Sequence, residues 1–415
     1  SKTIQPNPAT TPARQAKPAE QSPTQPQAEP KTTLRPMPKL RQRPTITPAI
    51  QQMKQPIQVV LQHHYNRPEN AAQRSNWGMF HQIMIFGTDT QIAVGGRGRR
   101  YNAVAWMSGN QICQRDRLFT ADQYGILPRS GTGLQGHQGQ MLAIYGLIGV
   151  PSSYPLVVGK KRYTVRDVVA REMADCRSDT ELSFTLIGLS RYIETDATWT
   201  ARDGSKWNFE RILELELAQP IAGAACGGTH RLMALAHALN ARRSEKRPIT
   251  GHWKRAELYL NDYVQHCYQL QNADGSFSTN WLEGRENRND IARKIQTSGH
   301  IVEFLLSLTP DSQLSDPRLT RAMQFLTFTM YRDRKTEWAV GPRGHALRSL
   351  MLYHKRMYNS TTPWRTRATV AARPSVPSST PARSPSRYSP PQNAVSYRGT
   401  KSNSRANARR RVSYR

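Results

Sequence analysis

The stretch Gly299-His300-Ile301-Val302-Glu303-Phe304-Leu305-Leu306-Ser307-Leu308 places a glycine-histidine pair at the start of an apolar run. Similar copies begin at Gly136-His137, Thr229-His230 and Gly344-His345. Each run is hydrophobic on nearly all sides, which is typical of a helix buried among other helices. A fifth apolar run follows Glu181 and a sixth begins near Trp77. The repeat therefore predicts six buried helices.

Amphipathic segments alternate with these apolar runs. They are expected to form outer helices, because a single helical hairpin cannot bury its own apolar face. The expected outer helices are residues 102–108, 165–174, 209–218, 253–270, 317–331 and, closing the series, 57–65. Short turns at 158–161 and 202–206 predict β-hairpins. The sequence thus predicts an all-α fold, an α/α toroid of six helical hairpins with small β-hairpins in its loops.

The net charge of +30 is concentrated toward the two ends of the chain. Residues 360–415 contain twelve Lys and Arg and no Asp or Glu, and residues 1–56 are rich in Pro and Gln. Segments of this kind bury too little apolar surface to fold alone. We expect a disordered Pro-rich linker (1–56), a toroid domain (57–359) and a disordered basic tail (360–415). The tail is expected to bind a polyanion, either nucleic acid or an acidic envelope polymer, or to remain solvated without a dedicated partner.

Two features of the sequence bear on the cellular location of the protein. No run of eighteen apolar residues occurs, so no transmembrane span is expected. The sequence begins with Ser1 and continues into a Pro-rich segment, as it does where an export signal or anchor is removed. A cloning boundary would look the same. We therefore expect an exported protein, periplasmic or associated with the envelope.

The segment Gln271-Asn272-Ala273-Asp274-Gly275-Ser276-Phe277 resembles the glutamine/aromatic repeat of squalene cyclases and protein prenyltransferase β subunits. Residues 253–308 resemble uncharacterised bacterial proteins of this terpenoid cyclase and prenyltransferase superfamily, of the kind found in planctomycetes. The resemblance extends from about residue 57 to residue 358 and implies the toroid fold. In such repeats the Gln and Gly have a structural role: the Gly permits a tight turn and the Gln bonds helix ends.

The activities of better-known relatives are not supported by this sequence. It has no Asp-x-Asp-Asp run and no Asp-Asp pair, so neither known route of terpene cyclisation is expected. Toroid thioester domains carry Cys-Gly-Glu-Gln, whereas residues 226–229 here read Cys-Gly-Gly-Thr. Because the Gln is replaced by Thr229, an internal thioester cannot form.

Zinc is the cofactor that the residues leave open. Cys226 and His230 are four residues apart at a loop-to-helix junction, which suits shared zinc ligation. Outer helices end, and inner helices begin, on one face, where helix N-termini favour neutral histidines and an anionic ligand. We expect a binding mouth on this face, formed by His137, Glu181, His230, His300 and His345. In the alternative interpretation, each histidine only bonds a neighbouring loop carbonyl.

Carboxylates and thiols give two further candidates. Asp274, Glu283 and Glu303 are candidate catalytic carboxylates of a glycan-cleaving site, with an ion pair to Arg293 or another nearby Arg as the alternative for Glu303. Cys113 and Cys176 follow adjacent outer helices and are the candidate disulfide of an exported protein, with inert buried thiols as the alternative.

Two functions therefore remain. One is a non-catalytic toroid that binds a protein or an envelope polymer, which the absence of known catalytic signatures favours. The other is an enzyme whose mouth holds a small-molecule, isoprenoid, glycan or peptide ligand, with a Cys/His zinc site or a carboxylate site.

Overall fold

The structure is a computed structural model that describes residues 44–365. Within these residues it contains twelve α-helices and nine short strands. The helices are α1 (Pro48–Tyr65), α2 (Asn76–Phe86), α3 (Ala103–Ser108), α4 (Gln140–Ile148), α5 (Val165–Ala174), α6 (Ser183–Tyr192), α7 (Phe209–Ala218), α8 (Thr229–Ser244), α9 (Gly251–Gln269), α10 (Ile291–Leu308), α11 (Pro317–Arg332) and α12 (Val340–Met357). The strands are β1 (Glu69–Asn70), β2 (Gln91–Val94), β3 (Arg99–Asn102), β4 (Phe119–Asp122), β5 (Gly125–Pro128), β6 (Pro155–Val158), β7 (Lys161–Thr164), β8 (Thr198–Thr200) and β9 (Lys206–Asn208). The chain is therefore mainly helical, as the sequence predicts.

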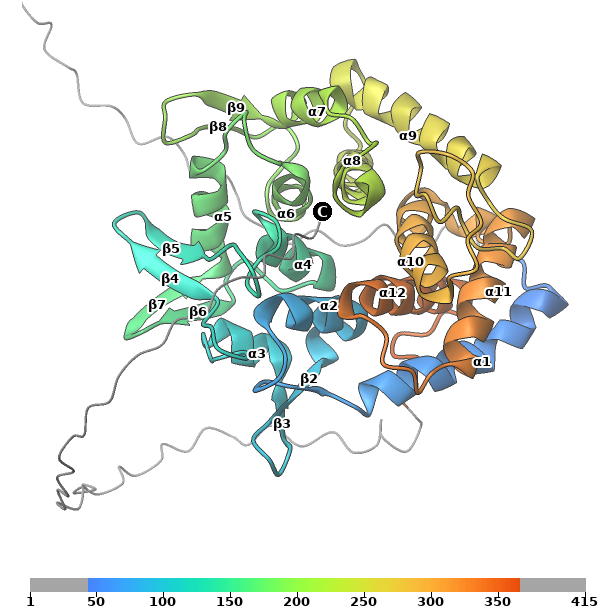
Figure 1. The fold of residues 1–415 in the computed structure, drawn as a ribbon. Coiled ribbons are helices and arrows are strands. Elements are labelled where there is room, and N and C mark those ends of the chain that lie inside the picture. Colours follow the sequence, from blue (N-terminus) through green and yellow to red (C-terminus); the bar gives the residue numbers. More distant parts are fainter. Residues whose placement is uncertain (1–43, 366–415) are drawn as a thin grey trace, which may run out of the picture. The chain divides into compact units, whose positions relative to one another are not determined.

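The even-numbered helices form the centre of the described part. Helices α2, α4, α6, α8, α10 and α12 each contact the next in this order, and α12 contacts α2, so the series closes on itself (Figure 1). All ten residues of α6 are buried, and in α2 every residue except Trp77 is buried. The expected burial of the apolar runs is thus confirmed.

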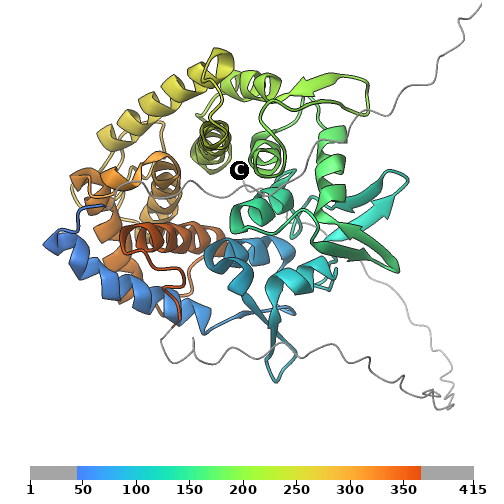
Figure 2. The same cartoon turned by 180° about the vertical axis from the view of Figure 1, so that it is seen from behind.

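The odd-numbered helices pack outside this series, as both views show (Figures 1 and 2). The bounds of α5 and α7 agree with the prediction, and α9 and α11 differ from it by two residues or fewer at each end. Helix α1 packs on α11 and α12 and buries one apolar side, formed by Ile50, Met53, Ile57, Val60 and Leu61.

The predicted N-terminal boundary after residue 56 is wrong, because it falls inside α1. The helix begins at Pro48, where the Thr47 hydroxyl accepts a hydrogen bond from the backbone N–H of Ile50 at 3.3 Å. The polar composition of residues 51–56 resembles a linker, yet Met53 is fully buried among them. Together with Ile50 and Ile57, Met53 forms an apolar side at helical spacing, which packs this segment against the core.

The predicted C-terminal boundary at residue 360 is also too early. The Trp364 side chain is buried, with its ring centroid 5.4 Å from that of Phe86 in an edge-to-face contact. Arg365 forms an ion pair with Asp89 at 2.8 Å. The folded part therefore reaches residue 365 at least. The remaining parts of the predicted linker (1–43) and tail (366–415) lie outside the described residues.

Two inner helices begin earlier than predicted. Helix α10 begins at Ile291, nine residues before His300, and α12 begins at Val340, five residues before His345. The first turns of α10 are polar and resemble a loop in sequence, but the Asp290 side chain caps them by accepting from the N–H of Arg293 at 3.0 Å. His300 and His345 therefore lie inside helices and not at their N-termini.

Short β-hairpins project outward from this core (Figure 1). The predicted hairpins are confirmed as β6–β7 and β8–β9, with Val158 opposite Lys161 and Thr200 opposite Lys206. Two further antiparallel pairs, β2–β3 and β4–β5, were not predicted. Within residues 44–365, no helix has the combination of length and hydrophobicity that a membrane span requires.

Candidate functional site

Five histidine rings from five different segments meet among the inner helices. His300 of α10 stacks on His345 of α12 with ring centroids 3.6 Å apart. The His230 ring of α8 lies 5.0 Å from that of His137 and 5.5 Å from that of His345. His81 of α2 lies 5.5 Å from His345. We call these five residues the histidine cluster.

Buried carboxylates of outer helices hold the inner helices around the cluster. Glu216 of α7 accepts from the N–H of Leu182 at 3.0 Å and from the hydroxyl of Ser183 at 2.6 Å, which fixes the start of α6. The same carboxylate pairs with Arg231 of α8 at 3.2 Å. Because Arg231 adjoins His230 in the sequence, this carboxylate also anchors the N-terminal turn that carries His230.

Four of the five rings have their tautomer fixed by a hydrogen bond from Nδ1. Two Nδ1–H groups donate to backbone carbonyls and two donate to carboxylates, which leaves Nε2 as the lone-pair nitrogen of any of these rings that is neutral. The pairs are His81 to Trp77 O (2.8 Å), His300 to Gln296 O (2.8 Å), His137 to Glu181 (2.7 Å) and His345 to Glu303 (2.7 Å). Metal-ligating histidines characteristically have this arrangement, with the second nitrogen donating to a carbonyl or carboxylate.

His230 is the exception within the cluster. Both of its ring nitrogens are buried and have no hydrogen-bond partner among residues 44–365. A buried polar group without a partner costs about 1–3 kcal/mol, so such groups are rare unless a ligand or ion satisfies them.

Burial keeps the inner rings neutral. It lowers the pKa of His81 to about 4 and lowers the pKa of His230, His300 and His345 well below the usual value, with neighbouring histidines adding to the shift at the last three. The expected neutrality is therefore found, but its main cause is burial. Neutral imidazole is the form that binds metal.

Cys226 completes a set of three metal donors. Its Sγ and one ring nitrogen each of His230 and His300 all lie within 4.8 Å of one another. Burial raises the pKa of the Cys226 thiol to about 11, so a bound cation would have to displace its proton. The backbone of Cys226 is left-handed, with φ +52°, which is uncommon for a residue other than glycine and marks a constrained turn.

These donors suit zinc in type and number. One thiolate and two imidazoles are typical zinc ligands, with bonds of about 2.3 and 2.0–2.1 Å that put neighbouring donors about 3.5 Å apart. Donors that lie within 4.8 Å reach this separation by moving together by about 1 Å or less. Cys226 and His230 were predicted from their spacing. His300 was predicted for the mouth, and its place beside the other two comes from the packing of α10 against α8.

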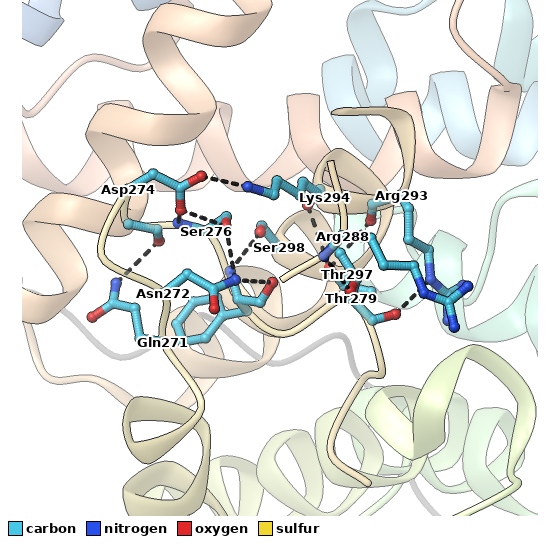
Figure 3. A network of polar contacts seen from close by, with 12 residues as sticks. Gln271, Asn272, Asp274, Ser276, Thr279, Arg288, Arg293, Lys294, Thr297 and Ser298 are labelled. Carbon is cyan, nitrogen blue, oxygen red and sulfur yellow. Dashed lines mark hydrogen bonds and ion pairs between the residues drawn. The ribbon is translucent and has the colours of Figure 1, made fainter. Parts of the chain in front are cut away.

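Trp281 covers one side of these donors. Its ring meets that of His300 edge-on at 5.3 Å, and a Cβ added to Gly227 would stand 2.4 Å from its Cγ. The loop that carries Trp281 is held by the predicted Gln/Gly motif (Figure 3). Gln271 donates to the carbonyls of Gly275 at 3.1 Å and Arg318 at 2.9 Å, which agrees with the structural role implied by the motif.

The three candidate catalytic carboxylates bond to separate partners. Asp274 accepts from Lys294 at 2.7 Å and from Ser276 at 2.6 Å in the loop network of Figure 3. These bonds outweigh burial and hold its pKa below the usual value, so Asp274 acts as a loop staple. Glu283 accepts from the N–H of Gly223 at 3.0 Å. Neither carboxylate bonds to the histidine cluster.

Glu303 alone of these carboxylates bonds to the cluster. Its carboxylate accepts from His345 Nδ1 and from Arg348 Nε, each at 2.7 Å. The predicted ion pair with an arginine is therefore found, with Arg348 as the partner. Glu303 therefore orients a cluster histidine and neutralises a buried arginine.

The predicted disulfide between Cys113 and Cys176 is not formed in this structure. Both are free thiols and fully buried. Cys113 lies in a turn where it pairs with Asp116, whereas the Cys176 thiol donates to the carbonyl of Glu172 at 3.4 Å. Burial raises the pKa of each thiol to about 12, which matches the alternative of inert buried thiols.

A cavity of about 640 Å³ lies along α5, and none of the five cluster histidines lines it. Its lining includes Gln138 and Thr180, the sequence neighbours of the His137–Glu181 pair, and continues along α5 to Arg171 and Arg202. This volume is within the range of small-molecule sites. The four predicted mouth histidines meet in the cluster, and Glu181 bonds to one of them, His137. The cavity lies to the side, between α5 and the hairpins.

Sequence reasoning missed His81. It lacks the preceding glycine of the other copies, since Phe80 stands before it, but it occupies the sixth apolar run and that position in the repeat could have identified it. A search of protein-family models, of curated proteins and of solved structures found no match to this chain.

Proposed function

We propose that residues 44–365 form an α/α toroid of the terpenoid cyclase and prenyltransferase type that acts as a zinc-dependent enzyme. The toroid assignment is supported by the closed order of contacts among the six even-numbered helices and by the outer placement of the odd-numbered ones. The Gln271–Phe277 motif supports the superfamily, since its Gln and Gly are used as that resemblance implies.

One observation carries the zinc assignment. His230 is buried with both ring nitrogens unpartnered, and it stands in one donor set with Cys226 and His300. An ion at this position would bind one ring nitrogen of His230 and use the Nε2 lone pair that the Nδ1 bond of His300 leaves free. His81 differs, because its Nδ1–H donates to the carbonyl of Trp77 within α2.

The number of protein ligands favours catalysis over a purely structural ion. Structural zinc sites are closed by four protein ligands, whereas catalytic sites have three and keep the fourth position for water or substrate. Zinc bound here would act as a Lewis acid. The chain contributes the His137–Glu181 and His345–Glu303 pairs around the donors, and a cavity of small-molecule size lies along α5. This combination favours an enzyme over the non-catalytic domain.

Metal analysis of the full chain tests the proposal. After equilibration with Zn²⁺ and removal of free metal, about one equivalent is expected in the unmodified protein and in Cys113→Ala, which removes another buried thiol. Cys226→Ala should lose most of this zinc. Substitution with Co²⁺ should give a thiolate-to-metal charge-transfer band in the unmodified protein and in Cys113→Ala, but not in Cys226→Ala. Absence of bound zinc, or equal zinc in both variants, would refute the proposal.

A further inference from the structure

Two β-hairpins beside α3 carry a set of exposed basic side chains. The tip of β2–β3 reads Gly95-Gly96-Arg97-Gly98-Arg99-Arg100-Tyr101, and all seven residues are exposed. The turn of β6–β7 reads Gly159-Lys160-Lys161-Arg162 and is exposed as well. The strands β3 and β6 both contact α3, and the turns of the two hairpins point away from it in different directions (Figure 1). We call residues 95–101 and 159–162 the hairpin surface.

The charges of the hairpin surface are largely uncompensated. Five of its basic residues form no ion pair with any residue in 44–365: Arg97, Arg99, Lys160, Lys161 and Arg162. The sixth, Arg100, donates to the carbonyl of Asn66 at 3.1 Å and keeps its charge. Arginines elsewhere are often paired, as Arg177 is with Asp179. A concentration of unpaired positive charge attracts anionic partners and accelerates their association.

The glycines leave the backbone of this surface open. Gly95 and Gly98 have left-handed φ values of +70° and +62°, and a Cβ added to either would meet no atom within 4 Å. The turn therefore needs glycine for its conformation, and no neighbouring chain segment fills the space. A bare backbone beside basic side chains lets an extended chain approach closely.

An aromatic ring stands at the base of the same tip. The Tyr101 side chain is 43% exposed and its ring centroid lies 5.4 Å from that of Trp106, which supports it from one side. Basic side chains interleaved with an exposed aromatic ring are the combination that single-stranded nucleic acid uses: phosphates pair with the charges and a base stacks on the ring. An acidic polysaccharide has no base to stack.

We propose that the hairpin surface binds single-stranded nucleic acid. Arg97, Arg99 and Arg100 contact phosphates, Tyr101 stacks on one base, and the Lys160–Arg162 turn is a second contact further along the same strand. The site is distinct from the zinc donors and does not depend on the proposed function. Binding is expected without strong sequence preference, because phosphate contacts and stacking on an aromatic ring accept any base.

Fluorescence anisotropy with a labelled single-stranded oligo-dT tests this proposal on the full chain at several salt concentrations. The variant Arg97→Gln/Arg99→Gln/Arg100→Gln should bind about tenfold more weakly or worse, and its logarithmic salt slope should fall by about 2, at ~0.7 per lost phosphate contact. Tyr101→Ala should weaken binding about tenfold at an unchanged slope. The matched control is Arg332→Gln/Arg334→Gln/Lys335→Gln at the end of α11, which removes equal charge and should change affinity less than twofold.

Two results would overturn the proposal. A control variant that loses as much affinity as the hairpin variant would show that only net charge matters, since the basic C-terminal tail is present in both. An unchanged affinity of Tyr101→Ala, together with equal competition by polyglutamate, would assign the surface to acidic polymers in general. The melting temperatures of all variants should equal that of the unmodified protein, because none of the replaced side chains is buried. Equal melting temperatures exclude misfolding as the cause of weaker binding.

Discussion

Replacing Glu303 should destabilise the protein more than any exposed acidic substitution. Its carboxylate on α10 accepts from Arg348 and His345 on α12, and Arg348 also donates to the carbonyl of Met84 on α2. The Glu303 and Arg348 side chains are only 7% and 6% exposed. The carboxylate is therefore the counter-ion of a buried guanidinium that joins three inner helices.

The magnitude follows from what is left behind. Glu303→Leu leaves Arg348 as an uncompensated buried charge, and breaking a buried pair from one side costs about 3–5 kcal/mol. The N–H of His345 also loses its acceptor, which adds to the cost. Replacing both partners, as in Glu303→Leu/Arg348→Met, removes the stranded charge. The double variant should therefore cost no more than Glu303→Leu alone.

Equilibrium urea unfolding, followed by circular dichroism with chelator present, measures these differences without a contribution from bound metal. The control is Glu257→Leu, whose partners Lys254 and Arg243 are largely exposed, and it should cost less than about 1 kcal/mol. A cost below about 1 kcal/mol for Glu303→Leu would refute the reasoning. So would a double variant whose cost is the sum of the two single costs.

Two more predictions concern pH and chain length. Three histidines outside the cluster have a pKa lowered to about 3, 3 and 4: His64, His237 and His354. The main cause is that the surrounding protein removes water from each ring. Since the unfolded chain binds these protons near pH 6.5 and the folded chain does not, their contribution to stability is full above pH 6.5. This contribution is lost as the pH falls towards 4, with a slope of up to ~4 kcal/mol per pH unit. Urea unfolding at pH 7.5 and 5.5 measures the change, and equal stability at the two pH values would contradict the prediction. Deleting residues 366–415 should weaken retention on a polyanion column at low salt and leave the melting temperature unchanged. Deleting residues 361–415 should lower the melting temperature as well, because the loss of the buried Trp364 side chain costs about 3–5 kcal/mol. Calorimetry of both truncations separates these effects, and equal melting temperatures would place the end of the folded part before Trp364.

The outer helices could be predicted closely because their signal is local. Helix α5 follows a hairpin turn, and its first turn is closed by mutual hydrogen bonds between Thr164 and Asp167, so its sequence contains its own boundaries. The start of α10 could not be predicted in this way. Its polar first turns are helical because Asp290 caps them and Ile295 is buried against other segments. Tertiary contacts decide such boundaries.

The candidate site shows the same division. Cys226 and His230 belong to one turn, and their spacing was enough to pair them. The stacking of His300 on His345 depends on the approach of α10 to α12, where the N–H of Ala346 lies 2.8 Å from the position of a Cβ on Gly299. A local pattern contains no information about such an approach. The histidine repeat identified four of the five cluster residues, and helix packing decided which of them lie next to Cys226.

The closed order of the inner helices affects how this protein folds during its synthesis on the ribosome. The hydrogen bond from Arg348 to Met84 joins residues 264 positions apart, and α1 packs mainly on α11 and α12. At about 5–20 residues per second, the apolar sides of α1 and α2 wait on the order of tens of seconds for those partners. During that time they are exposed to aggregation, and a chaperone that shields the nascent N-terminal helices would raise the yield of folded chains.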